Sequence, residues 1–531
     1  MLEQNLELNQ NLIDRVAIGD LLRRRARDTA DEEAIVDFYT GKRTSVTYQE
    51  LNAQVNKLGR AFRSVGLNKG DKLALLCSNR IEFMTVAFAC YKTGIVFTPI
   101  NYLQTVNDTV YNLEHAKVDA IVFEHSQQNL AIECADIVDS IKVLIDIDTD
   151  SNEGIHHLPT LIAQEEDGEI EDTTINDRET AQLLYTSGTT ANPKGVETSH
   201  LSLYFSTLNN AIDWEFTHGH VHLVVLPTFH CAALSLCLTT LQMGGKLIFP
   251  KAFDADLVLK LIETEKVQGT ALLPMMWRAL LASPNLSNWN YDSLTSSTYT
   301  MSAMDSKTLD KLRTTFGSKF HLGSGQSEFC PGACIYKDGS STEFGEGNYW
   351  GMPTRSTDQA ILDNEGNELA QGEVGEICWR GPQVMNGYLD DPEATKDTQK
   401  FGWHHSGDLG LIDEKGQLLF VDRKKDMIKS GGENVSSAKV EQVILEMPEI
   451  LQVAVFGVPH PKWSEAVCTA IQISPDFSDI NEASIINHCK QHLGNFEVPK
   501  KIFIVDHFNL TGTGKVKKAE LRQQYADTYI A

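Results

Sequence analysis

Residues 185–195 read Tyr-Thr-Ser-Gly-Thr-Thr-Ala-Asn-Pro-Lys-Gly, a segment rich in glycine and hydroxyl residues with a single lysine. An apolar run over 181–185 predicts a strand before it, and a helical pattern begins near Ser199. Such a turn can present backbone N–H groups and hydroxyls to a polyanion, with Lys194 as the counter-charge. A Walker loop is excluded, because it needs glycine where Pro193 stands and serine or threonine at Gly195.

Short apolar runs alternate with helical patterns on both sides of this turn. The clearest units are strands over 72–77, 221–226, 246–249 and 269–273, and helices over 81–92, 257–267 and 305–316. Thr47 and Glu50 have the spacing of a capping box, Asp254 precedes one helix and Gly94 follows another. The alternation predicts an α/β fold, with a large N-terminal domain of parallel and mixed sheets flanked by helices.

A second domain is predicted at the C-terminal end. Residues 421–426 form a charge-dense hexamer between a strand pattern and new helix and strand patterns. About a hundred residues follow, enough for a small domain. We expect domains at 1–423 and 424–531, the second a small, mobile α+β domain.

Charge and composition exclude several classes of protein. Lys and Arg total 46 and Asp and Glu 72, which gives a net charge of −26. This balance is unfavourable for nucleic acid and for anionic membranes. No apolar run approaches the ~20 residues of a membrane helix, and the N-terminus is not a secretory signal. The ten scattered cysteines are expected to be reduced and buried, so we predict a soluble, cytoplasmic protein.

His218, His220 and His222 alternate along the chain as metal ligands on one strand face would. No cysteine or acidic cluster lies nearby, so a surface turn is favoured over a metal site.

Beyond the first turn, four more motifs occur in a fixed order. They are Gly325-Gln-Ser-Glu328, Trp403-His-His-Ser-Gly-Asp408, Val421-Asp-Arg423 with Ser430-Gly-Gly-Glu-Asn434, and Thr513-Gly-Lys515 with Leu521-Arg522. With the turn at 185–195, they resemble the motifs of the acyl-adenylate-forming, or AMP-binding, enzymes, specifically the acyl-CoA synthetase branch. The resemblance covers essentially the whole chain. It implies that ATP activates a carboxylic acid to acyl-AMP, with Mg²⁺ present, and that coenzyme A then accepts the acyl group.

The same resemblance implies a role for each matching residue. Lys515, Glu328, Ser327 and Lys194 are expected to be catalytic, with Glu328 holding Mg²⁺. The N-terminal domain, 1–423, is expected to bind ATP and the acyl group. The expected ATP- and AMP-binding residues are Thr186, Ser187, Gly188, Thr189, Thr190, Lys194, Ser324, Gly325, Gln326, Asp408 and Arg423.

In this family the C-terminal domain rotates between the two steps about one residue, which corresponds to Lys425. One orientation brings Lys515 to the adenylate. The other brings the loop containing Gly431, Gly432 and Glu433 there, for the step with coenzyme A. The resemblance leaves a homodimer and a carrier-protein acceptor open as partners.

The acyl pocket is expected within residues 225–330. Its candidate lining residues are His230, Ala233, Met275, Trp277, Met301 and Ser302. This mostly apolar region looks most like crotonobetaine/carnitine-type and fatty-acid CoA ligases. No acidic residue for a substrate amino group is apparent after Phe229, which disfavours a peptide-synthetase domain.

Three positions depart from the family pattern. Ala191 replaces a glycine of the first turn, Ser324 an aromatic residue that stacks on adenine, and Ser302 a glycine beside the acyl pocket. They keep two alternatives open: an acyl-AMP ligase that loads a carrier protein, and a non-catalytic adenylate- or acyl-binding homologue.

Overall fold

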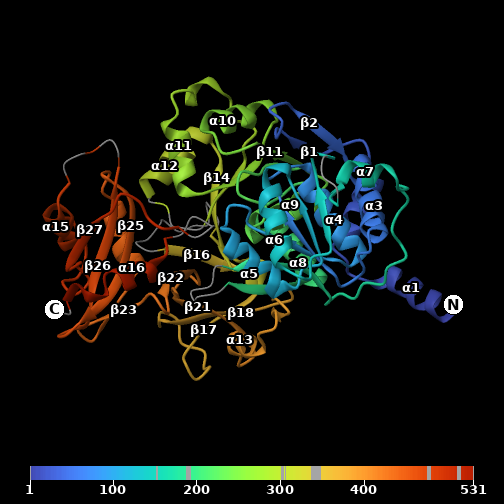
Figure 1. Cartoon of the computed structure of the whole chain (residues 1–531). Coiled ribbons are helices and arrows are strands. Elements are labelled where there is room, and N and C mark those ends of the chain that lie inside the picture. Colours follow the sequence, from blue (N-terminus) through green and yellow to red (C-terminus); the bar gives the residue numbers. More distant parts are fainter. Residues whose placement is uncertain are drawn as a thin grey trace. The chain divides into compact units, whose positions relative to one another are not determined.

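The computed structural model of the chain describes residues 2–150, 154–186, 193–300, 304, 306–336, 348–474, 477, 480–510 and 516–529. These residues form two compact units (Figure 1). The first unit contains the described residues up to 336 together with residues 353–358 and 380–397. The second unit contains residues 348–352 and 359–379 and the described residues from 398 on. A division into domains at 423/424 stays a prediction.

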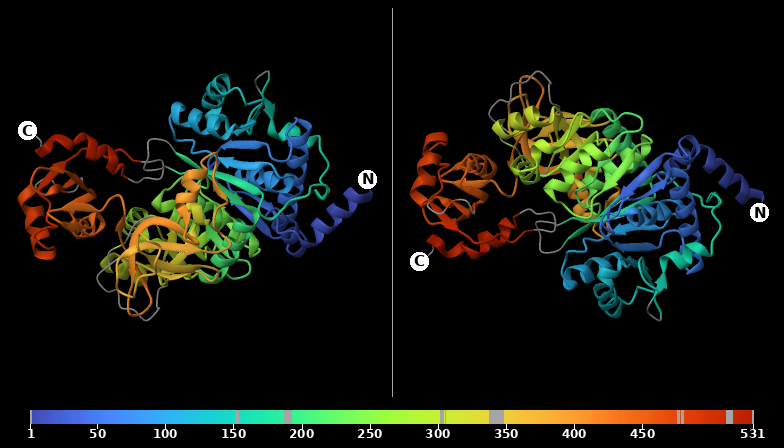
Figure 2. Two further views of the ribbon diagram at one scale, coloured as in Figure 1. Left: turned by 90° about the horizontal axis from the view of Figure 1, so that it is seen from below. Right: turned by 90° about the horizontal axis from the view of Figure 1, so that it is seen from above.

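The first sheet of the first unit contains the turn at 185–195 at one side. Its strands, in spatial order, are β19 (Gly387–Tyr388), β9 (Lys194–Ser199), β8 (Thr180–Thr186), β4 (Val96–Pro99), β3 (Lys72–Leu76), β5 (Ala120–Phe123), β6 (Val143–Asp146) and β7 (His156–His157). The pairs from β8 through β7 are parallel, whereas β8–β9 and β9–β19 are antiparallel. The blue strands of this sheet lie side by side in both views of Figure 2.

A second sheet in the same unit is also mostly parallel. Its strands, in order, are β2 (Thr44–Thr47), β1 (Glu33–Asp37), β11 (Lys246–Phe249), β10 (Val221–Leu223), β12 (Gly269–Leu272), β13 (Ser296–Tyr299), β14 (Lys319–Gly325) and β15 (Gly332–Tyr336). Only the outer pairs β1–β2 and β14–β15 of this series are antiparallel.

Helices flank these sheets, as the alternating pattern predicted. They are α1 (Leu2–Asp14), α2 (Asp20–Asp28), α3 (Tyr48–Ser64), α4 (Ile81–Thr93), α5 (Val106–Ala116), α6 (Gln128–Ile137), α7 (Leu158–Ala163), α8 (His200–Asp213), α9 (Cys231–Gln242), α10 (Ala255–Thr264), α11 (Pro274–Ala282), α12 (Ser306–Phe316) and α13 (Pro392–Thr398). Short 3₁₀ turns occur at η1 (His125–Gln127), η2 (Leu286–Asn288) and η3 (Ser327–Phe329).

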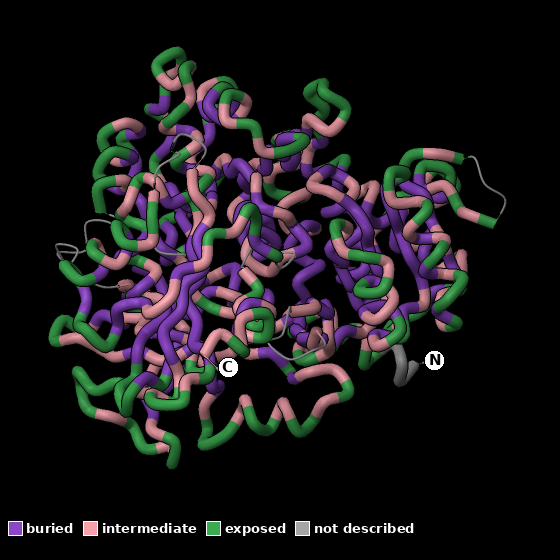
Figure 3. The backbone as a smooth tube through the Cα atoms, turned by 60° about the vertical axis from the view of Figure 1, so that its left-hand side comes forward, coloured by how far each residue is buried: buried purple, intermediate pink, exposed green. Residues whose placement is uncertain are grey.

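The core of the first unit includes a helix that is buried on nearly every side. Every residue of α4 except Glu82 is buried, and α4 contacts β3 and β4 of the first sheet and β1 of the second. A helix that is apolar all round has to be covered all round, so α4 lies between the two sheets. Figure 3 shows the buried strands and helices in purple inside a green surface of turns.

The second unit contains two smaller sheets. One consists of β16 (Asn348–Pro353), β22 (Leu418–Arg423), β21 (Trp403–Ile412), β18 (Gly375–Arg380) and β17 (Asp358–Leu362), with β20 (Gln399–Lys400) beside β21. The other consists of β24 (Glu433–Val435), β23 (Ile428–Ser430), β26 (Ser464–Ile473) and β25 (Ile450–His460), with β27 (Lys501–Ile504) beside β26. Helices α14 (Ser437–Leu445), α15 (Glu482–His492) and α16 (Lys518–Gln524) and the turn η4 (Ala526–Tyr529) accompany the second sheet. The predicted α/β class, with a small α+β C-terminal part, is confirmed.

Several local predictions are confirmed at the level of single hydrogen bonds. The Thr47 side chain accepts from the Glu50 N–H, and the Glu50 carboxylate accepts from the Thr47 N–H at 2.8 Å. Asp254 accepts from the Leu257 N–H at 2.8 Å, and Gly94 ends α4 with a positive φ of 72°. The strand predicted over 221–226 ends earlier, at Leu223, and beyond it the Asn79 side-chain amide donates to the Leu226 carbonyl at 2.9 Å.

The alternating histidines do not all lie in a surface turn, and that prediction is wrong for two of them. His218 is exposed, but His220 and His222 are 2% and 4% exposed. The His220 ring stacks on that of Phe216, and the His222 ring lies tilted beside it. His222 is buried because it lies in β10, a central strand of the second sheet of the first unit, and His220 directly precedes that strand. The ten cysteines are free, and all but Cys231 are buried, as predicted.

Candidate active site

The turn at 185–195 joins the antiparallel strands β8 and β9, and Thr186 lies directly opposite Lys194 in their register. Ser187, Gly188, Thr189 and Thr190 lie outside the described residues, and so does Ala191. Lys194 is one-third exposed, and its Nζ lies 4.6 Å from the ring centre of Tyr388 and 4.0 Å from Asp391 Oδ2. Its ammonium is held loosely enough to turn toward an anion.

The segment 324–328 leaves the end of β14 and enters the turn η3. Gly325 is required there, because a Cβ at this position would lie 1.5 Å from the carbonyl oxygen of Pro331. The Gln326 N–H donates to that same oxygen at 3.1 Å. The Ser324 carbonyl accepts a long 3.9 Å contact from the thiol of Cys334, and the Ser327 hydroxyl donates to Cys231 Sγ at 3.3 Å. The close packing of Gly325 against the Pro331 carbonyl therefore fixes the backbone position of Glu328.

Glu328 is held by its backbone and by its carboxylate. Its carbonyl accepts the Met385 N–H at 2.8 Å. Its Oε1 accepts the Tyr388 hydroxyl at 2.9 Å. Since Tyr388 also lies under Lys194, one tyrosine contacts two of the predicted catalytic residues. Tyr388 was not among the residues predicted from the sequence, where its signal would have been the segment Asn386-Gly-Tyr388.

In the second unit, Asp408 and Arg423 lie opposite each other on β21 and β22. Arg423 Nε is 3.8 Å from Asp408 Oδ1, and the aspartate side chain is 10% exposed. The turn before it is built by Gly407, with a φ of 74°, and by Ser406, whose hydroxyl accepts the Asp408 N–H at 3.0 Å. The pair presents one carboxylate and one guanidinium, as the predicted ribose contacts require.

A buried carboxylate supports this turn from behind. Glu376 Oε1 accepts the Gly407 N–H at 3.1 Å, and its Oε2 lies 3.1 Å from Lys424 Nζ and 3.2 Å from His405 Nδ1. Burial works to raise the pKa of Glu376, but the hydrogen bonds of His405 and Lys424 outweigh it and hold this pKa below its ordinary value. Glu376 therefore stays ionised and ties the Asp408 turn to the residues before Lys425. Sequence analysis missed it.

The predicted hinge residue, Lys425, is exposed and lies between residues that are anchored. On one side the Lys424 N–H donates to the Gly407 carbonyl at 2.9 Å. On the other side Asp426 pairs with Arg522 at 2.9 Å. Whether the chain rotates about Lys425 stays a prediction.

The Gly431-Gly432 loop is the two-residue turn of a hairpin, in which Ser430 pairs with Glu433. Both glycines have positive φ, 64° and 92°, which this type of turn requires. Glu433 is exposed. The Gly431 N–H donates to the carbonyl of Trp463 at 2.8 Å, so the loop is fixed to the turn between β25 and β26.

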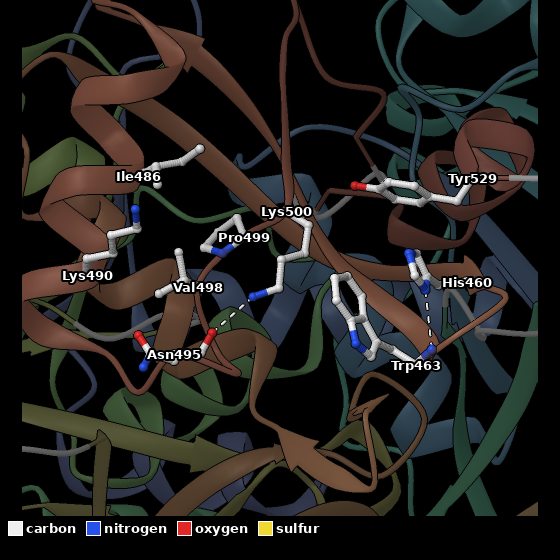
Figure 4. Close-up of a pocket in the computed structure, with 9 residues that line it drawn as sticks. All are labelled: His460, Trp463, Ile486, Lys490, Asn495, Val498, Pro499, Lys500 and Tyr529. Atoms are coloured by element: carbon white, nitrogen blue, oxygen red, sulfur yellow. Dashed lines mark hydrogen bonds between the residues drawn. The ribbon is translucent and has the colours of Figure 1, made fainter.

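A cavity of about 410 Å³ lies beside that attachment (Figure 4). Trp463 stacks on His460 with ring centres 4.1 Å apart, and Lys500 lies 5.7 Å from the Trp463 ring centre. Burial, and then the ammonium of Lys490, lowers the pKa of Lys500. Two lysines and the rings of His460, Trp463 and Tyr529 thus line one hollow, which was not predicted from the sequence.

The predicted acyl-pocket residues do not share one environment. Trp277 is fully buried against Phe316 and Phe320, and its indole N–H donates to the Thr298 carbonyl at 3.1 Å. Met275, two residues earlier on α11, is 67% exposed. Two residues turn a helix by about 200°, so these two side chains point to opposite sides.

Ala233 is buried in the first turn of α9, and His230 precedes this helix with its ring 4.5 Å from that of Phe229. Met301 and Ser302 lie outside the described residues, and so does Lys515. In the part of the chain that is described, no helix is both long enough and apolar enough to cross a bilayer.

Comparison with known proteins identifies the family. The profile of the AMP-binding enzyme family matches residues 22–389, and that of the AMP-binding enzyme C-terminal domain matches 439–515. The chain is 32% identical to a feruloyl-CoA synthase from an Amycolatopsis species, over 91% of this chain and 94% of that protein. It is 30% identical to a long-chain fatty-acid–CoA ligase of Mycobacterium tuberculosis, over 96% and 99%.

A solved structure gives the same result for the fold. The ATP-bound MatB from Rhodopseudomonas palustris has a TM-score of 0.85 and 26% identity, covering 96% of this chain and 99% of that one. The chain therefore belongs to the AMP-binding enzyme family and to its acyl-CoA synthetase branch, which joins a carboxylic acid to coenzyme A at the expense of ATP.

Proposed function

We propose that the protein activates an apolar carboxylic acid and that the residues named above carry out the two steps. A carboxylate oxygen of the acid attacks the α-phosphorus of ATP, and the bond to the bridging oxygen breaks, so that pyrophosphate leaves. The sulfur of coenzyme A then attacks the acyl carbon, the bond from that carbon to the phosphate oxygen breaks, AMP leaves, and the thiol proton is released to solvent. Charge neutralisation is the main requirement of the first step.

The observation that carries this assignment is the convergence of Glu328 and Lys194 on Tyr388. The side chain of Tyr388 thus contacts both a carboxylate that is suited to Mg²⁺ and an ammonium that is suited to phosphate oxygens. Lys194 would neutralise the leaving pyrophosphate, together with the hydroxyls of the turn. Asp408, backed by Arg423, would accept hydrogen bonds from the ribose hydroxyls.

The residues fit Mg²⁺ that is brought by ATP. Among the described residues, no group of three or more His, Cys, Asp or Glu side chains is gathered as a metal site. Mg²⁺ is commonly held by one or two carboxylates together with substrate phosphates, and Glu328 offers one such carboxylate. When bound, the ion would neutralise phosphate charge.

The cavity at Trp463 and Lys500 suits the nucleotide end of coenzyme A. An adenine can stack on the indole, and the two ammonium groups can pair with its phosphates. The cavity adjoins the loop at Gly431, which we expect to act in the thioester step.

Lys500→Ala and Trp463→Ala should each raise the KM for coenzyme A severalfold and leave the KM for ATP unchanged, whereas Lys501→Ala should change neither.

For the acid, the relatives support long apolar or aromatic substrates, since their names give feruloyl and long-chain fatty acids. A crotonobetaine-type substrate stays a prediction.

The buried, free cysteines support a reducing, cytoplasmic location. A homodimer stays a prediction, and coenzyme A is favoured over a carrier protein as acceptor because these relatives are CoA ligases.

The decisive experiment measures pyrophosphate release with ATP and Mg²⁺ across hydroxycinnamic acids and fatty acids of increasing length, with and without coenzyme A. We expect release that depends on one class of acid, with coenzyme A consumed alongside. Nucleotide binding without release for any acid would contradict the proposal in favour of a binding protein.

Lys515→Ala separates the two steps. We expect loss of acyl-AMP formation, while supplied acyl-AMP is still converted with coenzyme A. Lys517→Ala is the matched control, since Lys517 pairs with Glu520 at the surface. Loss of both half-reactions in Lys515→Ala would contradict the assigned role of this lysine.

A further inference from the structure

A short segment of the first unit connects the turn at 185–195 with Glu328. The Asn386 N–H donates to the Glu197 carbonyl at 2.9 Å, and the Leu389 N–H donates to that of Gly195 at 2.8 Å. In the same segment the Met385 N–H donates to the Glu328 carbonyl. Residues 385–389, which we name the bridging segment, are thus bonded on one side to β9 and on the other to η3.

Tyr388 is the residue of this segment whose side chain reaches both sites. Its hydroxyl donates to Glu328 Oε1 at 2.9 Å, and its ring centre lies 4.6 Å from Lys194 Nζ. The tyrosine is itself fixed, because its N–H donates to Thr395 Oγ1 at 2.9 Å and because it pairs with Val196 across β19 and β9. It is half-buried, so solvent competes only partly for these contacts.

We propose that Tyr388 is a positioning residue for the magnesium–pyrophosphate end of ATP. By donating to Oε1, the phenol fixes the orientation of the Glu328 carboxylate, which would hold Mg²⁺. By lying under the ammonium, the ring keeps Lys194 near the turn without using its charge in a tight ion pair. Asp391, at 4.0 Å, is a weak competitor for that charge. The inference rests on the proposed function, since it assigns a partner to Glu328 and to Lys194.

Two substitutions separate the two contacts. Tyr388→Phe removes the hydrogen bond to Glu328 and retains the ring below Lys194. Tyr388→Leu removes both. Tyr48→Phe is the matched control, because the Tyr48 hydroxyl is buried and donates to the Gly245 carbonyl, away from these residues.

The experiment is calorimetric titration of each variant with ATP, once in Mg²⁺ and once in EDTA. For Tyr388→Phe we expect ATP affinity in Mg²⁺ to fall about tenfold, the usual effect of losing a hydrogen bond to a charged group. Affinity in EDTA should be unchanged. Tyr388→Leu should lose affinity in both conditions, and Tyr48→Phe in neither.

A half-reaction distinguishes positioning from general damage. Both Tyr388 variants should convert supplied acyl-AMP and coenzyme A at the wild-type rate. Wild-type affinity of Tyr388→Phe for ATP in Mg²⁺ would overturn the inference, and so would an equal loss in both half-reactions.

The failure of this inference and that of the proposed function can be told apart. If the wild-type protein binds Mg²⁺ and ATP but releases no pyrophosphate with any acid, the proposed function is wrong. The calorimetric titrations then still decide whether Tyr388 positions Glu328 and Lys194. An active wild type whose Tyr388→Phe variant titrates identically overturns the positioning role alone.

Discussion

Asp408 and Arg423 face each other across β21 and β22, with Arg423 Nε 3.8 Å from Asp408 Oδ1. The two residues lie in separate sequence motifs, and antiparallel pairing brings them together. A carboxylate can accept several hydrogen bonds, so Asp408 is suited to the ribose hydroxyls that the proposed function assigns to it.

Asp408→Ala should weaken ATP binding. A lost charge-assisted hydrogen bond costs about 1.5–3 kcal/mol, so we expect the KM for ATP to rise about ten- to a hundredfold in pyrophosphate exchange. The matched control is Asp358→Ala, which breaks the exposed pair of Asp358 with Arg380 and should change the KM little. An unchanged KM in Asp408→Ala would remove Asp408 from the nucleotide site.

Glu376→Gln should act on the same turn indirectly. It removes the charge that faces Lys424 and His405, while the amide oxygen can still accept the Gly407 N–H. We expect a severalfold higher KM for ATP and a smaller change in the conversion of supplied acyl-AMP. Glu365→Gln, at an exposed turn of the same unit, is the control. Identical kinetics of the Glu376 variant and the control would show that the buried charge is dispensable.

Gly325→Ala should destabilise the first unit. The added Cβ would meet the Pro331 carbonyl oxygen at 1.5 Å, a clash with backbone that no rotamer change relieves. We expect a loss of about 3 kcal/mol in the free energy of unfolding. Gly168→Ala is the control, since its Cβ would lie 3.6 Å from Arg60 in ordinary contact. Denaturant titration of both variants checks this, and equal midpoints would contradict the predicted clash.

The sequence predicted features that depend on neighbours in the chain. The capping box at Thr47 and the glycine stop at Gly94 follow from local hydrogen bonds and φ preferences. The order of motifs predicted the family, and so the roles of Asp408 and Glu328. For these residues, the neighbours within a few positions of the chain determine most of the local structure.

Features set by long-range pairing could not be predicted in the same way. Tyr388 and Glu328 are 60 residues apart and meet only because β19 pairs with β9. Trp277 and Met275 both looked like pocket residues, since an apolar helix segment does not reveal which side meets the core. The exposure of His222 was misjudged because a central strand of three residues carries too short a pattern.

Four buried histidines, His200, His220, His222 and His404, should make the folded protein less stable in acid. Burial lowers the pKa of His200, His220 and His404 to about 4 and that of His222 to about 3. In the described structure, His220 Nε2 and His222 Nδ1 have no hydrogen-bond partner, which fits neutral rings.

The sign follows from proton uptake. In the unfolded chain these rings titrate near pH 6.5, so below that pH the unfolded state binds more protons than the folded state and stability falls. At pH 5 each ring contributes a loss of about 2 kcal/mol relative to neutral pH. The loss ends only below the folded pKa, near pH 4 or 3.

Urea unfolding between pH 7.5 and 5 measures the effect. His222→Leu should reduce the pH dependence of the free energy of unfolding by about 2 kcal/mol over this range, because one buried titrating group is gone. His156→Leu is the control, since His156 is exposed and its removal should leave the slope unchanged. A slope that is the same in both variants would mean that His222 is protonated in the folded protein, and burial in β10 would then not set its charge.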